Sequence, residues 1–262
     1  MSTLTLAALA TLVFCAPGYP GGAGDAQPYV DQFAKAAAAS AGWKPDSLAA
    51  TYDPTEQGSV VKLGEQDSVL AFMPYAFYVQ HAATLHLAPI AQADMVGVGT
   101  QERWTLVGKA GGPAPAAMTG YTILSVAGYA PEFVKHSALA GWTLPADVKI
   151  EATGQILSAL RRVASGEPVL ALLDQTQAAA LSTLPFAAQL KTLTQSAALP
   201  VALIAVVDSR LPDARANAFQ TALVKLNSTN GAAEMLASLK LKGFVLPQLP
   251  GNPGNPGNPG KP

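Results

Sequence analysis

The chain has 262 residues, of which 50% are hydrophobic, and its 16 Lys and Arg nearly balance its 17 Asp and Glu. A chain of this length and composition can bury a large core, as one α/β domain or as two small lobes, which excludes disorder for most of its length. Because no basic run is longer than the pair Arg161 and Arg162, the sequence lacks a surface that would follow the phosphates of a nucleic acid.

Residues suited to redox or metal chemistry are few and scattered. Cys15 is the single cysteine, so no internal disulfide can form. His81, His86 and His136 lack metal-site spacing with one another and with Cys15, and we interpret them as surface residues. We therefore expect no metal and no cofactor.

The two ends of the chain differ from its middle. Residues 4–14 form an apolar run that is too short to span a bilayer as a helix, and no Lys or Arg precedes it. We interpret residues 1–10 as a possible partial, atypical export signal ahead of the first strand, and we expect no transmembrane span. Residues 250–262 repeat Gly-Asn-Pro three times, and this density of Pro and Gly predicts a disordered tail over residues 248–262.

Between the ends, an apolar run, a turn and an amphipathic helix recur in order. The first unit is a strand at 12–16, a turn rich in Pro and Gly, and a helix with Asp25 as N-cap and Gly42 beyond its end. The second is a strand at 69–73, followed by a helix that starts at Pro74 and carries an aromatic cluster. Further strands are predicted at 85–90 and 104–109.

The pattern restarts after residues 111–115, a break rich in Gly and Pro that suits a crossing between lobes. A helix opens at Pro131, another follows the predicted N-cap Thr153, and a third starts at Asp174, where Gln177 completes a capping box. Strands are predicted at 121–124, 148–151, 169–173 and 201–207, and helices at 213–226 and 232–239 precede an apolar finish at 244–246.

The alternation of strands and helices predicts an α/β fold with parallel strands and helical crossovers. Two halves of similar size are joined by two crossings, so we expect two lobes, each a mostly parallel sheet flanked by helices. Residues 11–105 and 206–247 would form a discontinuous first lobe, and residues 106–205 the second.

Six stretches carry a family resemblance, and in chain order they are GYPGGAGDAQ, VLAFMPYAFY, LSVAGYAPEFV, GEPVLALLDQ, SAALP and LKGFVL. Together they resemble the phosphate and phosphonate branch of the type 2 periplasmic binding proteins, the solute receptors of ABC importers. The similarity covers residues 11–247 in order and spacing. It implies an exported protein, periplasmic or secreted, that holds a small anionic ligand (phosphate, phosphonate or a related organic anion) between its lobes and passes it to an ABC permease.

The fold class points to the same place independently. Ligands of open α/β sheets bind outside the carboxyl ends of the strands, where helix N-termini present unsatisfied N–H groups that favour an anion. Each candidate group also has a plainer explanation: the first turn as a flexible loop, the aromatic cluster as core, and the turn before Pro131 and the carboxylate at 174 as helix caps. The candidate ligand-binding residues are Tyr19, Gly21, Gly22, Gly24, Tyr75, Phe77, Tyr78, Ser125, Gly128, Tyr129 and Asp174.

Two features bear on the ligand. Arg103 beside Glu102 could form a fork to an oxyanion, although a surface charge pair explains the two residues as well. The family places a polar run of the Ser-Thr-His type where this chain has Ser125-Val126-Ala127, so either the ligand differs from phosphonate or the site serves another role.

The sequence contains no nucleophile elbow, no Ser-x-x-Lys motif, no P-loop and no dinucleotide fingerprint, so we expect a binding protein and not an enzyme. We also expect a monomer. Two alternatives stay open. One is a sensor or protein-interaction module on the same fold with a vestigial cleft, and the other is an enzyme that shares the two-lobed architecture.

Overall fold

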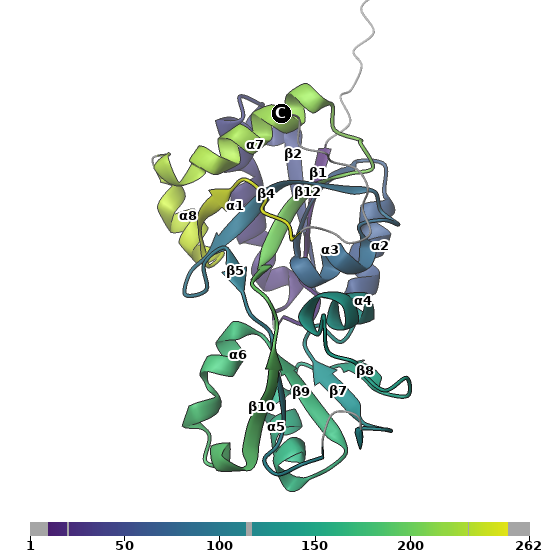
Figure 1. Ribbon diagram of the computed structural model, residues 1–262. Helices are drawn as coiled ribbons and strands as arrows, with labels where there is room; N and C mark the ends of the chain where they lie inside the picture. The colour runs from purple at the N-terminus through teal and green to yellow at the C-terminus, as the bar shows by residue number, and fades with distance from the viewer. Residues whose placement is uncertain (1–9, 20, 114–116, 230, 251–262) are drawn as a thin grey trace, which may run out of the picture.

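The computed structural model describes residues 10–19, 21–113, 117–229 and 231–250. Two lobes lie one above the other and are joined by a narrow waist (Figure 1). The first lobe is built on a six-stranded sheet in the order β13-β4-β12-β3-β1-β2, and the second on a five-stranded sheet in the order β10-β6-β9-β7-β8. Residues 1–9 of the predicted export signal, 114 and 115 of the predicted crossing and 251–262 of the predicted tail lie outside the described residues.

In the first sheet β1, β2, β3 and β4 run in one direction, and β12 and β13 run in the other. β1 pairs in parallel with β2 and β3, whereas β12 runs antiparallel between β3 and β4, and β13 is antiparallel to β4. The strands are β1 Ala10–Cys15, β2 Leu48–Asp53, β3 Ser68–Pro74, β4 Leu87–Met95, β12 Ala202–Val207 and β13 Leu241–Val245. The helices are α1 Ala23–Ser40, α2 Glu56–Gly64, α3 Tyr75–His81, α7 Asp213–Lys225 and α8 Ala232–Ser238, with 3-10 turns at Pro45–Ser47 and Leu226–Ser228.

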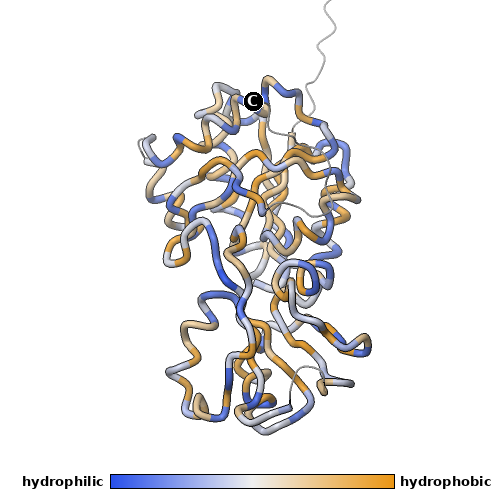
Figure 2. The backbone as a smooth tube through the Cα atoms, viewed as in Figure 1, coloured by the Kyte–Doolittle hydropathy of each residue, from blue (hydrophilic) through white to orange (hydrophobic). Residues whose placement is uncertain are grey.

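Helices cover both faces of this sheet. α1, α7 and α8 pack on one face around the fully buried Phe33 and Phe219, and α2 and α3 pack on the other around Leu63 and Phe77. Hydrophobic residues follow the strands through the interior of both lobes (Figure 2). The carboxyl ends of β1 and β3 therefore point from a rigid core toward the second lobe.

The second lobe repeats the plan on a smaller scale. β9 is buried along its whole length between β6 and β7, as its continuous apolar sequence predicts. The strands are β6 Thr105–Lys109, β7 Thr122–Ser125, β8 Lys149–Ala152, β9 Val169–Leu173 and β10 Leu190–Gln195. The helices are α4 Pro131–Phe133, which continues as a π-helical turn at Val134–Ala138, α5 Ile156–Ser165, α6 Gln175–Ala179 and 3-10 turns at Leu181–Thr183 and Ala187–Gln189.

The two crossings between the lobes are bound to each other. β5 Gln101–Glu102 pairs antiparallel with β11 Leu199–Pro200, and beside this pair the Trp104 backbone N–H donates to Ser196 Oγ at 2.9 Å. We propose that the lobes meet at this pair. Thr105 then belongs to the second lobe and residues 202–205 to the first, a few residues from the predicted boundaries.

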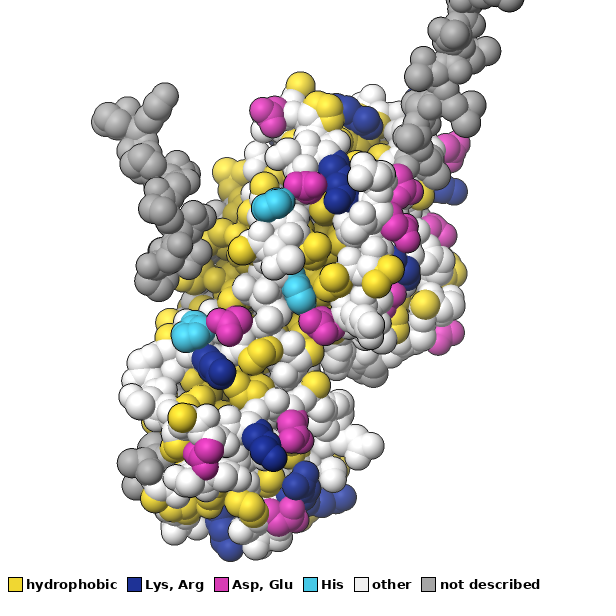
Figure 3. Space-filling view, turned by 90° about the vertical axis from the view of Figure 1, so that its right-hand side faces the viewer, with side chains coloured by type: hydrophobic (Ala, Val, Ile, Leu, Met, Phe, Trp, Pro, Cys, Tyr) yellow, Lys and Arg dark blue, Asp and Glu magenta, His cyan; other side chains and the backbone are white. Residues whose placement is uncertain are grey.

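The lobes also touch away from the crossings. The ring of Phe133 in α4 lies edge-on to Tyr75 of α3, with ring centroids 6.1 Å apart, and the Glu132 backbone N–H donates to Gln80 Oε1 at 3.1 Å. A Cβ atom on Gly18 would overlap the carbonyl oxygen of Val126 in the second lobe. On the face shown in Figure 3 the two lobes meet without an open gap. The structure is therefore a closed arrangement of the lobes.

Two predicted helix caps are wrong. α1 begins at Ala23 with Gly22 as its extended N-cap residue, so Asp25 lies within the first turn, where its negative charge complements the helix dipole. α5 begins at Ile156, because Gln155 is not helical; Thr153 instead accepts the Gln155 backbone N–H through its hydroxyl at 3.1 Å.

Apart from the two-residue strands of the crossings and the short 3-10 turns, three elements escaped prediction because they bury little. β2 and β10 are edge strands, and β2 buries only its two end residues fully. In α2 only Ser59 and Leu63 are buried, and Gly58 weakens the helical pattern. The glycine is needed because the carboxylate of Asp53 lies where its Cβ would be.

Candidate functional site

A small pocket lies where the two lobes and the crossings meet. Its walls come from the loop after β1, the start of α3, the β5 crossing and the turn after β7. In the closed arrangement the free volume is about 10 Å³, which is at the lower limit of what holds one water molecule. The lining residues are Pro17, Tyr19, Pro74, Tyr75, Ala76, Glu102, Trp104, Val126, Ala127, Tyr129 and Val201.

Two buried carboxylates give this pocket negative charge. Glu102 exposes 6% of its surface and accepts the indole N–H of Trp104 at 3.2 Å. Its pKa is raised to about 7, first by burial and then by the negative charge of Asp174. Burial also raises the pKa of Asp174. Within the described part of the chain, neither carboxylate forms an ion pair with Lys, Arg or His.

Tyr19 and Tyr129 bring two hydroxyl groups to the same place. Tyr19 exposes 41% of its surface, but its hydroxyl end is buried close enough to Glu102 and Asp174 for their charges to raise its pKa, after burial itself. Burial raises the pKa of Tyr129 as well, and Tyr19 is the next contributor. Both hydroxyls stay protonated at neutral pH and can donate a hydrogen bond to an oxyanion.

Aromatic rings close the pocket on the α3 side. Tyr75 stacks on Tyr78 with ring centroids 5.9 Å apart, and Trp104 meets Phe133 edge-on at 5.2 Å. Tyr75 and Trp104 line the pocket, and Tyr78 packs behind Tyr75. Phe77 lies on the far side, fully buried in the core beneath α2 and α3. Of the predicted aromatic cluster, the structure therefore brings one member, Tyr75, to the pocket.

The turn before α4 has most of its polar groups occupied. Ser125 is fully buried, and its hydroxyl donates to the Leu172 carbonyl at 2.8 Å and accepts the Ala127 N–H at 3.2 Å. The N–H groups of Gly128 and Ala130 donate within the turn. A Cβ on Gly128 would overlap the backbone of Glu151 and Ala152, so this glycine allows the turn to pack on β8. Direct ligand contact by Ser125 and Gly128 stays a prediction.

The first turn lines a second, larger cavity. Tyr19, Gly21 and Gly22 border a cavity of about 390 Å³ in the first lobe, next to the interlobe pocket, whereas Gly24 is the second residue of α1 and does not line it. Gly21 has a φ of 138°, a conformation that favours glycine. Ligand contact by Gly21 stays a prediction.

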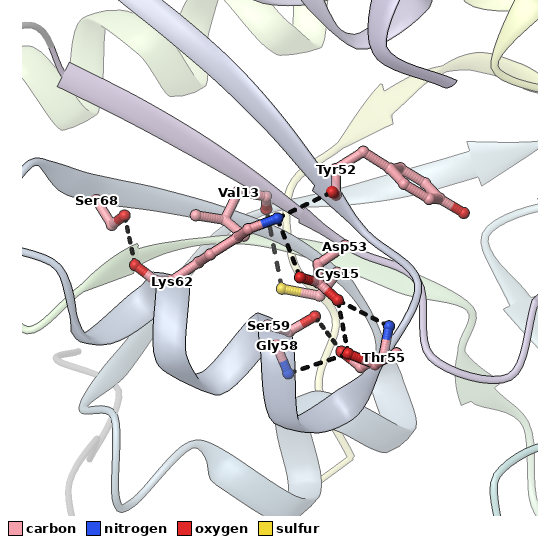
Figure 4. Close-up of polar contacts among 9 residues, drawn as sticks. All are labelled: Val13, Cys15, Tyr52, Asp53, Thr55, Gly58, Ser59, Lys62 and Ser68. Atoms are coloured by element: carbon pink, nitrogen blue, oxygen red, sulfur yellow. Dashed lines mark hydrogen bonds and ion pairs between the residues drawn. The ribbon is translucent and has the colours of Figure 1, made fainter. Parts of the chain in front are cut away.

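Another polar cluster, drawn in Figure 4, is complete within itself. Asp53 at the end of β2 pairs with Lys62 at 3.0 Å and accepts the backbone N–H of Thr55 at 2.9 Å. These partners lower the pKa of Asp53 against the effect of burial. A carboxylate of the protein thus already occupies the N-terminal end of α2, where an anionic ligand would otherwise be favoured.

Sequence reasoning underrated Glu102 and Trp104. Glu102 is buried and does not form the surface charge pair with Arg103 that was the plainer explanation; Arg103 instead donates to the Ser196 carbonyl at 2.8 Å. The two charged residues Glu102 and Arg103 directly before a tryptophan were the available signal. Asp174 forms the predicted capping box, in which its carboxylate accepts the Gln177 N–H at 2.8 Å. Its negative charge also acts on Glu102 and raises the pKa of that residue.

The histidines have carboxylate partners, of which the closest is Glu56 at 2.8 Å from His81 Nε2. The described residues include no group of three or more His, Cys, Asp or Glu arranged for a metal ion. None of the described helices is both long and apolar enough to cross a membrane.

Two sheet-based lobes, paired crossings and a pocket lined from both sides define the class of two-lobed solute-binding proteins. XAC2383 from Xanthomonas citri has the same fold: in its chloride-bound structure the TM-score is 0.66 at 12% identity, over 93% of this chain and 92% of that one. PhnD1 from Prochlorococcus marinus, in complex with methylphosphonate, gives a TM-score of 0.58 at 12% identity, over 92% and 93% of the two chains.

The sequence family is narrower than the fold. The family model for periplasmic substrate-binding proteins of phosphonate ABC transporters matches residues 113–249, and the chain belongs to this family. No curated protein matches the chain in sequence. The predicted family, the two-lobed α/β fold and the role of capturing solute for an ABC importer are confirmed. Proteins of this family are typically periplasmic, and binding for an ABC transporter is their general role.

Proposed function

We propose that this protein captures, between its lobes, a small organic anion that also carries a protonated amine, and delivers it to an ABC permease. In this proposal the protein is a periplasmic monomer and does not transform its ligand. The observation that carries the proposal is the pair of buried carboxylates, Glu102 at 6% and Asp174 at 8% exposure, neither of which has a Lys, Arg or His partner among the described residues.

A buried charge without a counterion is costly, so the pocket favours a ligand that supplies one. An ammonium group between the two carboxylates would offset one of their two negative charges and donate hydrogen bonds to both. The aromatic rings of Tyr75 and Trp104 line the same pocket. A fully ionised phosphate without an amine would meet only repulsion at this end.

The acid group of the ligand would accept hydrogen bonds from the hydroxyl groups of Tyr19 and Tyr129. The hydroxyls of Tyr19 and Tyr129 are protonated at neutral pH, as ordinary tyrosines are, and burial raises their pKa values further. A zwitterion could therefore direct its ammonium to the two carboxylates and its phosphonate to the two hydroxyl groups of the same pocket. The methylphosphonate seen in PhnD1 supports a phosphonate-type acid group.

Binding requires the lobes to separate, because the closed pocket of about 10 Å³ has no room for such a ligand. The ligand would enter when the crossings at β5 and β11 flex, and would then be held by groups from both lobes. Only contacts that span both lobes can favour the closed state over the open one. Tyr19 on the first lobe and Asp174 on the second satisfy that condition.

The proposal is tested by isothermal titration calorimetry at pH 7.5 with 2-aminoethylphosphonate and ethylphosphonate. Because a hydrogen bond to a charged group contributes about 1.5–3 kcal/mol, we expect the amine to increase affinity roughly 10- to 100-fold. Glu102→Gln should reduce that preference, while Glu234→Gln on the exposed face of α8 should leave it unchanged. Equal affinity for the two phosphonates in the unmodified protein would refute the amine site.

A further inference from the structure

The cavity of about 390 Å³ in the first lobe, called here the apolar chamber, is not accounted for by the interlobe pocket. It lies between the start of α1, the carboxyl ends of β1 and β3, and the end of α8. Its volume is within the range of about 300–1,000 Å³ that small-molecule sites occupy. The side chains that form its apolar walls are Phe14, Tyr29, Tyr52, Phe72, Met95 and Leu239.

The chamber and the interlobe pocket share a wall. Tyr19, Pro74 and Val201 line both cavities. The Tyr75 N–H donates to the Val201 carbonyl at 3.0 Å, which joins the start of α3 to the second crossing and fixes two of these three residues. Tyr19 lies on the loop after β1, so it is the part of the wall that a ligand could displace.

The walls of the chamber are apolar yet accessible. Tyr29 exposes 47% of its surface, a high value for an aromatic residue at the rim of a hollow. Asp25 is the one charged residue among the described residues that line the chamber, so a second anionic group would be repelled there. A neutral apolar group would instead cover tyrosine, phenylalanine and methionine surface that water now contacts.

From these observations we propose that the apolar chamber receives an aromatic or branched-alkyl substituent of the ligand whose ammonium group lies at Glu102 and Asp174. This inference rests on the proposed function and narrows it to amphiphilic amino-phosphonate-like solutes. An apolar cavity of about 150 Å³ is enough for benzene, so the chamber has room for an aryl ring with a short linker.

The substituent should raise affinity by a predictable amount. Each buried methylene contributes about 0.8 kcal/mol, which is close to fourfold in affinity, so a buried benzyl group should give at least a 20-fold gain. We expect 1-amino-2-phenylethylphosphonate to bind at least 20-fold more tightly than aminomethylphosphonate in calorimetry. Equal affinity of the two compounds would overturn the chamber and leave the amine site standing.

Two variants separate the chamber from the interlobe pocket. Ala26→Phe would fill the chamber from α1, and Tyr29→Ala would remove part of its rim at an exposed position where folding is preserved. Both should abolish most of the gain given by the phenyl group while leaving aminomethylphosphonate affinity within twofold. Ala39→Phe, at an exposed position near the other end of α1, is the matched control and should keep the gain.

A dye measurement tests the chamber with a probe that carries no ammonium group and no acid group. N-phenyl-1-naphthylamine, a neutral aromatic dye whose emission rises in apolar surroundings, should bind the unmodified protein and lose at least tenfold in affinity with Ala26→Phe. Unchanged dye binding in that variant would overturn the chamber. If the dye binds as expected but neither aminophosphonate does, the proposed function fails, and with it the assignment of the chamber to such a ligand.

Discussion

The buried carboxylate of Glu102 makes stability depend on pH in a direction opposite to that of a salt-bridged acid. Its pKa is about 7 in the folded protein, against 4.5 in the unfolded chain. The folded state therefore binds more protons than the unfolded state between these values, and the free energy of unfolding falls as pH rises through this window. At about 1.4 kcal/mol per pKa unit, the loss between pH 4.5 and pH 8 is about 3 kcal/mol.

The measurement is thermal unfolding of the ligand-free protein from pH 4.5 to pH 8, followed by circular dichroism. A loss of about 3 kcal/mol corresponds to a fall in Tm of roughly 6–12 °C for a chain of this size. Glu102→Gln removes the titrating group and should flatten the profile over the same window, whereas Glu234→Gln should not. A profile that keeps its full slope in Glu102→Gln would show that the carboxylate is not buried as described.

Three further predictions concern the lobes and the ligand. Gly18→Ala should lower the free energy of unfolding by about 1–3 kcal/mol more than Gly42→Ala, which shares the positive φ but has open space around it. X-ray scattering should show a larger radius of gyration for Gly18→Ala. Equal effects of the two substitutions would mean that the loop does not contact Val126. Gly128→Ala should destabilise the second lobe by about 1–3 kcal/mol, because its Cβ would overlap the β8 backbone. Gly154→Ala is the control, because no atom lies within 4 Å of the added Cβ, and it should leave the stability unchanged. Hydrogen exchange in β7 and β8 measures the difference. Because Glu102 is about half protonated at pH 7, binding of an ammonium group beside it should release roughly half a proton. The release is measured as the difference in binding enthalpy between HEPES and Tris buffers. No release would mean that the ammonium does not approach Glu102.

The core of the fold could be predicted from the sequence because its strands are continuously apolar. β9 coincides with its predicted range, and β3 and β12 differ from theirs by a residue at an end. The edge strands β2 and β10 could not be predicted, because half of their surface faces solvent and their composition is that of a loop. Helix starts at α1 and α5 were misplaced because extended backbone at Gly22 and a non-helical Gln155 decide them, and neither leaves a mark in side-chain pattern.

The site was harder to predict than the fold. Motif reasoning placed anion-binding groups at the turn of Ser125 and Gly128, where a serine and a glycine also serve packing against β9 and β8. The same residue types fit both roles, so only the hydrogen-bond partners separate them. Glu102 escaped notice because burial of a charged residue depends on two crossings that pair across almost a hundred residues of sequence.

Two opposing contributions act at the interlobe pocket in the closed arrangement. Aromatic contacts between Tyr75, Trp104 and Phe133 hold the lobes together, while the like charges of Glu102 and Asp174 oppose the burial that closure imposes. At low pH the charge term vanishes and closure needs no ligand. At higher pH an ammonium group would remove the repulsion in place of protons. In this pocket the ligand therefore has to supply positive charge, and new apolar contact matters less. For this reason its amine, and not its acid group, should determine whether the lobes close.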